Sequence, residues 1–346
     1  MLALFVLAFL AQPSRSTSLA QVQPTTSSIK YLIVGGKITD EYGQDGLIKD
    51  VEKIDLTKGA HSNCVKPPDY PTEVHGFDAN SVHGGSSVVA CGGLNDYGFL
   101  HSCQEFDPTK NSWEFFANMT KRRSLMSSIS RPSGDIWLIG GATWDFWHAG
   151  QTLDILKVDD HQAVAGPDLP VGLMYHCAVS INQTHVFIGS GNFIDNGGFN
   201  QAWMINTEYK TFDRVADMKY PRSGAGCGLV KTRDGSKGII MAGGLMDDSS
   251  KSPTTSEIYL LNSGEWIEGP ALPRNYQVGG HANPDDSTLV LAGGLEMDGK
   301  GRDDILVLDS SQTQFLEELK FTTSEAKLKT PRYLFAMVAV RDEDKC

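Results

Sequence analysis

Residues 88–93 read VVACGG, a short run of apolar side chains that ends in a pair of glycines. Five further runs have the same form: YLIVGG (31–36), IWLIGG (136–141), IIMAGG (239–244), LVLAGG (289–294) and a degenerate VFIGSG (186–191). Successive runs start about 50 residues apart, and a period of that size indicates a repeat architecture in which each unit is one supersecondary structure. The sequence therefore predicts six similar units.

Each unit carries further landmarks in the same phase. A second apolar run follows the glycines and ends in an acid or amide, at Asp55, Asp107, Asp159, Asn206, Asn262 and Asp309. An aromatic residue comes a few positions later in three units, at Trp113, Phe212 and Trp266. A segment led by proline or arginine, such as PRYLFAMVAV (331–340), then opens the next unit. These landmarks predict four short strands per unit, and the strand before the glycines is expected to be buried on both faces.

The glycine pairs explain the composition, because 36 of the 346 residues are glycine against an average of about 7%. Glycine permits positive φ angles and close backbone approach where units crowd together, so the pairs are predicted to be structural. They are Gly35, Gly36, Gly92, Gly93, Gly140, Gly141, Gly189, Gly191, Gly243, Gly244, Gly293 and Gly294. No pair is followed by the helical pattern with Lys-Ser/Thr that a phosphate-binding loop requires.

The period, glycine pair, turn acid and late aromatic together resemble the kelch-repeat β-propeller family over nearly the whole chain. The resemblance implies an all-β fold, a six-bladed kelch β-propeller with four antiparallel strands per blade. The chain enters the repeat at a second-strand motif (31–36) and leaves it after a first-strand motif (331–340). We therefore expect the C-terminal strand to complete blade one and to close the ring, which removes two open sheet edges.

The N-terminal residues 2–11, LALFVLAFLA, form an unbroken apolar run. As a helix this run would be about 15 Å long, too short to cross a bilayer, and it is typical of a signal peptide. The alternative is a buried N-terminal strand. We expect a signal peptide at 1–20, a linker at 21–30 and a single propeller at 31–346, in a secreted, extracellular protein without a membrane span. Two glycosylation sequons, at Asn118 and Asn182, fit that compartment.

The chain has six cysteines, an even number that permits disulfides in an exported protein. Cys91 and Cys103 flank one loop on successive strands of blade two, and we predict a disulfide between them. Cys177 and Cys227 occupy equivalent first strands of neighbouring blades near the axis, where they are either bridged or simply buried. A third pair, Cys64 and Cys346, is a candidate to tie the closing blade.

Aromatic residues gather in the loops of three adjacent blades, after the glycine pairs of blades two, three and four. They are Tyr97, Phe99, Trp144, Phe146, Trp147, His148, Phe193 and Phe199. Exposed aromatic anchors dominate binding hot spots, so these residues are predicted to bind a partner. The alternative is that the loops fold over and bury their own rings.

The charge of the chain narrows the class of partner. The formal net charge is −12, which makes nucleic acid a poor partner because an acidic chain repels phosphate. Four arginines stand at the start of first strands: Arg123, Arg222, Arg274 and Arg332. We expect them either to surround the channel mouth and bind acidic ligands or to pair with the turn acids. The favoured prediction is a binding module whose partner is an extracellular protein or a glycan, with no cofactor and no metal site.

The same resemblance carries an enzymatic alternative. Copper-radical oxidases of the galactose/glyoxal oxidase type contain kelch propellers, and use a Tyr-His pair and a cysteine cross-linked to tyrosine on first strands. The matching residues here are Tyr175, His176, Cys227 and Tyr276, but their order differs from the family pattern and Leu295 stands where a stacking aromatic is expected. A sugar-epimerising kelch enzyme is a further alternative, for which no acid/base pair is found. No catalytic residue is assigned.

Overall fold

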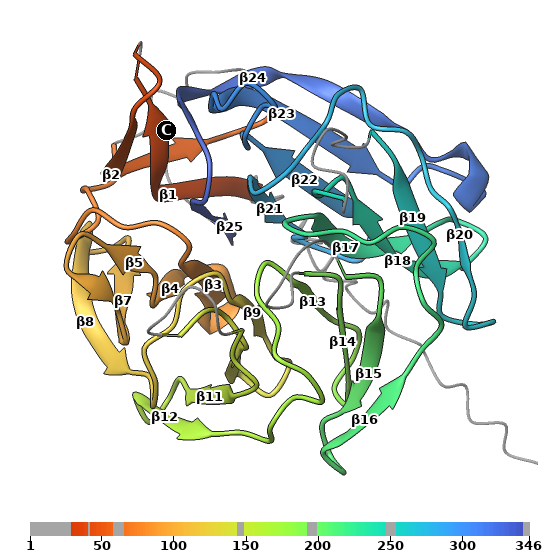
Figure 1. Ribbon diagram of the computed structural model, residues 1–346, viewed down its shortest axis with the longest axis horizontal. Helices are drawn as coiled ribbons and strands as arrows, with labels where there is room; N and C mark the ends of the chain where they lie inside the picture. The colour runs from red at the N-terminus through yellow and green to blue at the C-terminus, as the bar shows by residue number, and fades with distance from the viewer. Residues whose placement is uncertain are drawn as a thin grey trace, which may run out of the picture.

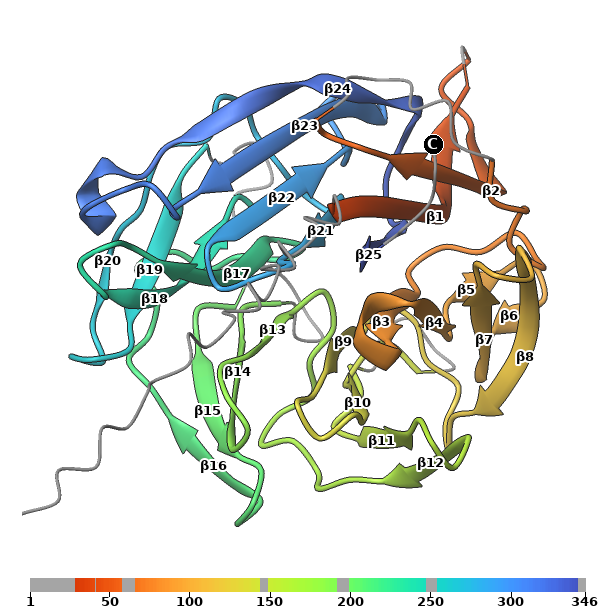
Figure 2. The same cartoon turned by 180° about the vertical axis from the view of Figure 1, so that it is seen from behind.

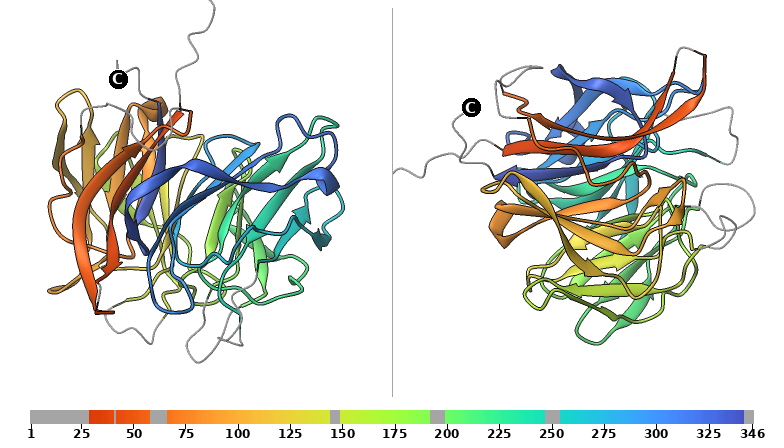
Figure 3. Two further views of the ribbon diagram at one scale, coloured as in Figure 1. Left: turned by 90° about the horizontal axis from the view of Figure 1, so that it is seen from above. Right: turned by 90° about the vertical axis from the view of Figure 1, so that its left-hand side faces the viewer.

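Six antiparallel sheets stand side by side around a central axis and form a six-bladed propeller (Figures 1 and 2). This computed structural model describes residues 29–40, 42–57, 66–143, 149–191, 199–246 and 254–341. The predicted all-β, six-bladed fold is confirmed. Seen edge-on, the strands run between two faces of the disc, on which the connecting loops gather (Figure 3). Among the residues just given, no helix has the length and apolar character that crossing a bilayer requires.

Blades two to six each consist of four antiparallel strands, named here from the axis outward. Blade two is β3 (Asp78–Val82), β4 (Ser87–Cys91), β7 (Ser102–Asp107) and β8 (Ser112–Asn118). Blade three is β9 (Ser127–Ser130), β10 (Ile136–Ile139), β11 (Leu153–Lys157) and β12 (Gln162–Ala165). Blade four is β13 (Cys177–Ser180), β14 (His185–Gly189), β15 (Ala202–Asn206) and β16 (Thr211–Arg214). Blade five is β17 (Gly226–Lys231), β18 (Lys237–Ala242), β19 (Ser256–Leu260) and β20 (Trp266–Glu268). Blade six is β21 (Gly280–Ala282), β22 (Thr288–Ala292), β23 (Arg302–Asp309) and β24 (Phe321–Arg332).

Blade one joins the two ends of the chain, as the sequence predicted. It contains the C-terminal strand β25 (Ala336–Arg341), then β1 (Ile29–Thr39) and β2 (Asp45–Ile54). β25 pairs antiparallel with β1 from Ile29 opposite Arg341 to Val34 opposite Ala336. Three strands of this blade are described, and residues 58–65 after β2 lie outside the described part. β1 begins at Ile29, which already pairs with Arg341 in the ladder. Residues 29 and 30 therefore belong to the propeller and not to the linker that was expected at 21–30.

A circle of backbone hydrogen bonds also closes the ring at the start of the first strands. One residue from each blade adopts a positive φ, between 47° and 65°, and its N–H donates to the carbonyl of the corresponding residue in the preceding blade at 2.5–2.9 Å. These residues, called the backbone ring below, are Gly76, Leu125, Tyr175, Gly224, Val278 and Leu334. The last bond of the circle runs from the Gly76 N–H to the Leu334 carbonyl and so links blade two to blade one, at the two ends of the repeat.

The glycine pairs occupy the end of each second strand, where the backbone turns sharply beside the next blade. At Gly92, φ is +70° and an added Cβ would lie 2.6 Å from the Arg123 carbonyl oxygen, so only glycine fits. Blade four differs from the prediction. Gly189 is the last residue of β14, and Ser190, with a φ of 60°, takes the first left-handed position while Gly191 takes the second. The structural pair in this blade is therefore Ser190-Gly191: Gly191 is in the predicted place, and Ser190 takes the position expected for Gly189.

Candidate functional site

The first region of interest is the face that carries the loops after the second strands. Antiparallel strands reverse direction at each connection, so these loops and the connections between blades end on one face, called the loop face below. In blade two the loop forms a small hairpin of β5 (Leu94–Asn95) and β6 (Gly98–Phe99). Tyr97 lies in its turn and is 97% exposed, and its N–H donates to Asn95 Oδ1 at 2.9 Å.

Phe99 anchors this hairpin to the propeller. It is buried and packs in a cluster with Leu125, Ala142, Ala149 and Met174 from blades three and four. Phe99 therefore supports the loop, while Tyr97 is presented to solvent. Phe199 is partly buried and stacks on Trp203, with ring centroids 5.7 Å apart. The other aromatic-loop residues predicted to bind lie outside the described residues: Trp144, Phe146, Trp147, His148 and Phe193.

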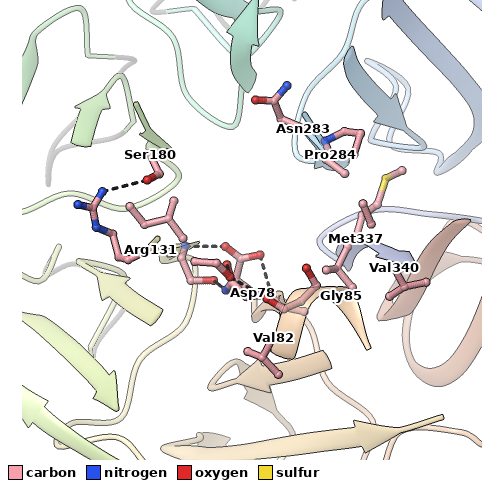
Figure 4. A pocket seen from close by; sticks show the side chains of 18 of the residues that line it. Asp78, Val82, Gly85, Arg131, Ser180, Asn283, Pro284, Met337 and Val340 are labelled. Atoms are coloured by element: carbon pink, nitrogen blue, oxygen red, sulfur yellow. Dashed lines mark hydrogen bonds between the residues drawn. The ribbon is translucent and has the colours of Figure 1, made fainter. Parts of the chain in front are cut away.

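The second region is a cavity of about 590 Å³ on the axis. The innermost strands of the blades line it, to Arg341 at the end of β25, and it extends past the ends of other innermost strands to Gly85, Arg131 and Pro284. Figure 4 shows side chains from different blades converging on this space. The cavity therefore opens on the face opposite to the loop face, whereas a smaller hollow of about 90 Å³ lies beside the backbone ring.

Blades two and three contribute a polar wall to the axial cavity. In blades two and three, Asn80 Nδ2 donates to Ser128 Oγ at 2.5 Å, and the Ser128 N–H donates to Asp78 Oδ2 at 2.6 Å. Met337 and Val340 of blade one supply hydrocarbon on the other side (Figure 4).

Arg131 lines the same cavity but is occupied by structural contacts. Its guanidinium donates to Ser180 Oγ at 2.9 Å, to the Gln183 carbonyl at 2.6 Å and to Thr207 Oγ1 at 3.2 Å. The residue is only 6% exposed. Arg131 thus ties blade three to the first turn of blade four, and its donors face protein groups.

Asp78 supplies the carboxylate of the polar wall. Burial raises its pKa to about 6, although the hydrogen bonds from the Ser128 and Ala79 N–H groups act in the opposite direction and lower it. The folded chain therefore binds this proton more tightly than the unfolded chain. The resulting contribution to stability is full below the ordinary pKa of 3.8 and is lost as the pH rises through about 6.

We expect this linkage to appear when wild type is compared with Asp78→Asn. The melting temperature of wild type minus that of the variant should fall as the pH is raised from about 4 to about 7, because only wild type must ionise a buried group. Differential scanning fluorimetry over a pH series measures it, with Asp160→Asn as the control at an exposed carboxylate. A difference that stays constant with pH would contradict the assignment.

The described residues contain two disulfides. Cys91 and Cys103 lie opposite each other on β4 and β7 and form a disulfide, as predicted. Cys177 and Cys227 are also bridged, which decides between the two alternatives left open for them. Cys64 and Cys346 lie outside the described residues.

His281 lies beside the second bridge and was not singled out in the sequence. Its Nε2 is 3.9 Å from Cys177 Sγ and 4.0 Å from Cys227 Sγ. Burial lowers the pKa of its imidazole to about 4, so the ring is neutral at physiological pH.

The predicted arginines do not surround an open channel mouth. Arg123, Arg222 and Arg332 are fully buried, and Arg274 is nearly so. Each pairs with an acid on a third strand rather than with a turn acid. Arg123, Arg222 and Arg274 pair within their own blades, with Asp154, Glu257 and Asp304. Arg332, the last residue of β24 in blade six, pairs with Glu52 of β2 in blade one. A guanidinium buried between strands must be neutralised there, so the arginines are fixed within the blades.

The residues of the enzymatic alternative do not assemble as the resemblance implies. The Cys227 sulfur is bonded to Cys177, and the Tyr276 hydroxyl is buried and donates to the Gly280 carbonyl at 3.0 Å. His176 is 5% exposed, and burial lowers its pKa to about 3. A cysteine–tyrosine cross-link therefore has no free thiol at this position.

The two sequon asparagines are accessible. Asn118 is exposed at the end of β8, and Asn182 is exposed in the first turn of blade four, where its Oδ1 accepts the Thr184 and His185 N–H groups. Both positions satisfy the steric requirement for a glycan, and glycosylation stays a prediction.

Comparisons with known proteins agree with this architecture. The Kelch motif family matches residues 76–120, which include all four strands of blade two. Kelch-like protein 41a of Danio rerio is 38% identical over 63 residues, a match that spans 18% of this chain and only 10% of that relative. A solved structure titled "Structure of YjhT" superposes with a TM-score of 0.67 at 13% identity, and the match covers 85% of this chain and 97% of that one. At that identity the structural likeness shows the fold alone.

Proposed function

Since this chain is a kelch-repeat β-propeller, we propose that it is a secreted binding module whose loops in blades two to four engage an extracellular protein or a glycan. A propeller of this kind is a scaffold for binding or enzyme-like activity in general, so the particular function must come from its surface. The exposure of Tyr97 on an anchored hairpin is the observation that carries this proposal.

The hairpin has the physical properties of a binding element. A tyrosine offers a large contact area with few rotatable bonds, so little conformational entropy is lost on binding. The Asn95 side chain and the buried Phe99 hold the turn in place before any partner arrives, which lowers the cost of association.

The proposed compartment is supported by two observations. The apolar run at residues 2–11 has the length and position of the apolar segment within a signal peptide. The described part of the chain also holds two disulfides, and these persist in oxidising compartments.

A binding comparison tests the loop face. Fluorescently labelled full chain is applied to a printed glycan array and to a panel of displayed extracellular domains, and the strongest binder is titrated with variants. We expect Tyr97→Ala to weaken binding at least about tenfold, because a hot-spot residue contributes about 2 kcal/mol or more.

Tyr209→Ala is the matched control. Tyr209 is 71% exposed in the turn between β15 and β16, on the face opposite the hairpin, and its loss should leave the affinity unchanged. Equal binding by wild type and Tyr97→Ala, at equal melting temperature, would reject this surface.

A further inference from the structure

Two cysteines and a histidine from three neighbouring blades converge at the axis. Cys177 begins β13, Cys227 lies in β17 and His281 lies in β21. The three ligand atoms all lie within 4.8 Å of one another. The two cysteines are 0% and 2% exposed and are joined as a disulfide.

The distances match those of a thiolate–imidazole metal site. A tetrahedral zinc ion with Zn–S bonds of about 2.3 Å and a Zn–N bond of about 2.0 Å places sulfur and nitrogen about 3.5 Å apart and the two sulfurs about 3.8 Å apart. The observed distances from the His281 Nε2 to the two sulfurs, 3.9 and 4.0 Å, are already within about half an ångström of that sulfur–nitrogen distance. Only the two sulfurs must separate, and rotation about their Cα–Cβ bonds supplies that movement.

The cluster also has access to solvent. Cys227 and His281 line the axial cavity of about 590 Å³, whereas Cys177 lies behind them in the core between blades four and five. An ion held by the three side chains would keep a fourth position directed at the cavity, where water or a small ligand can bind. Catalytic zinc sites have the same coordination, with three protein ligands and a fourth position taken by water or substrate.

We propose that reduction of the Cys177–Cys227 disulfide converts this cluster into a binding site for a thiophilic ion such as Zn²⁺. The reductant is a dithiol, whose two thiols become a disulfide while the protein disulfide becomes two cysteine thiols. Zn²⁺ then replaces the two thiol protons, which leave to solvent, and His281 Nε2 donates its lone pair as the third ligand. The oxidised chain has no thiolate and does not hold the ion. This site is independent of the proposed binding face.

Metal titration of the full chain tests the proposal. The chain is reduced with a dithiol, desalted without oxygen and titrated with Cd²⁺, whose thiolate charge-transfer absorption reports binding, and with Zn²⁺ in competition. We expect one ion per chain in reduced wild type and in reduced Cys91→Ala/Cys103→Ala, which lacks the other described disulfide. We expect no such site in oxidised wild type or in Cys177→Ser/Cys227→Ser.

The histidine is tested separately. His281→Ala should weaken Cd²⁺ binding at least about tenfold, since even an outer-shell partner of a metal site contributes that much. Unchanged binding in His281→Ala or in Cys177→Ser/Cys227→Ser would overturn the proposal. If either variant fails to fold, cadmium–proton correlation NMR of reduced wild type decides: couplings to Cys177, Cys227 and His281 support the site, and couplings to other residues alone refute it.

Discussion

Deleting residues 331–346 is expected to leave the chain unable to fold into a soluble protein. The deletion removes β25 and with it the ladder to β1, and it removes Leu334 and therefore two bonds of the backbone ring. It also exposes Tyr31, Leu32, Ile33 and Val34, which are at most 4% exposed in the closed ring. An open apolar edge strand is a template for aggregation, and the lost burial is large against a net stability of about 5–15 kcal/mol.

Soluble yield, size-exclusion profile and thermal melting measure this effect. The control is a chain that ends at Arg341 and carries Cys64→Ser. It retains β25 and the backbone ring, and it has no cysteine at position 64 that the loss of Cys346 could leave unpaired. This control should be soluble and should melt as wild type does. Normal yield and melting of the longer deletion would show that the ring does not depend on its last strand.

Replacing Arg222 by methionine is expected to destabilise the protein by about 3–5 kcal/mol, the cost of leaving a buried charge without its partner. Arg222 is fully buried and donates to Glu257 Oε1 at 2.9 Å and to the carbonyls of Gly243 and Thr255 at 2.7 and 3.0 Å. Glu257 is 3% exposed, so its carboxylate would remain in the core without a cation.

Urea unfolding of two further variants separates charge from packing. Adding Glu257→Gln to Arg222→Met should recover part of the loss, because the amide keeps an acceptor for the Lys219 N–H while the buried charge disappears. Arg214→Met breaks the exposed Arg214–Asp217 pair and should cost at most about 1 kcal/mol. Equal losses for Arg222→Met and Arg214→Met would contradict the role assigned to the buried pair.

The closure of the ring could be predicted because the repeat itself specifies it. The first motif lacks a preceding first strand and the last segment, 331–340, has the form of one, so the two ends complement each other. The same alignment placed Cys177 and Cys227 on neighbouring first strands and so predicted that they lie close together. His281 was missed although it lies on the first strand of the next blade, as Cys227 does on its own. Blade six has no cysteine at this position, and a single histidine in the sequence did not indicate that it would lie beside the two cysteines.

The positions of the arginines could be predicted only in part. The sequence placed them at the start of the first strands. Whether an arginine side chain lies at the channel mouth or inside a blade depends on the direction in which the acids of the third strands point. Glu257 lies opposite Glu268 in the β19–β20 ladder and still turns its carboxylate to Arg222, a geometry that only the folded blade defines. Register, rather than residue type, therefore decides which acid is the partner.

The polar wall of the axial cavity had no sequence signal. Asp78, Asn80 and Ser128 are short polar residues that resemble turn residues when the chain is read linearly, and only the radial arrangement of the blades brings them together. Aromatic type was likewise insufficient to identify binding residues. Tyr97 and Phe99 stand two positions apart in one loop, yet the first is exposed and the second is buried.

The proposed binding face depends on a closed six-bladed ring, and native-state amide hydrogen exchange tests that closure most directly. The amides of Tyr31–Val34 and of Met337–Val340 that lie in the β1–β25 ladder should be as strongly protected as those of Ile136–Ile139 in β10, which belongs to a blade built from one continuous segment. Exchange of the β1 and β25 amides at the rate of an exposed chain end, while β10 stays protected, would show that the ring is open.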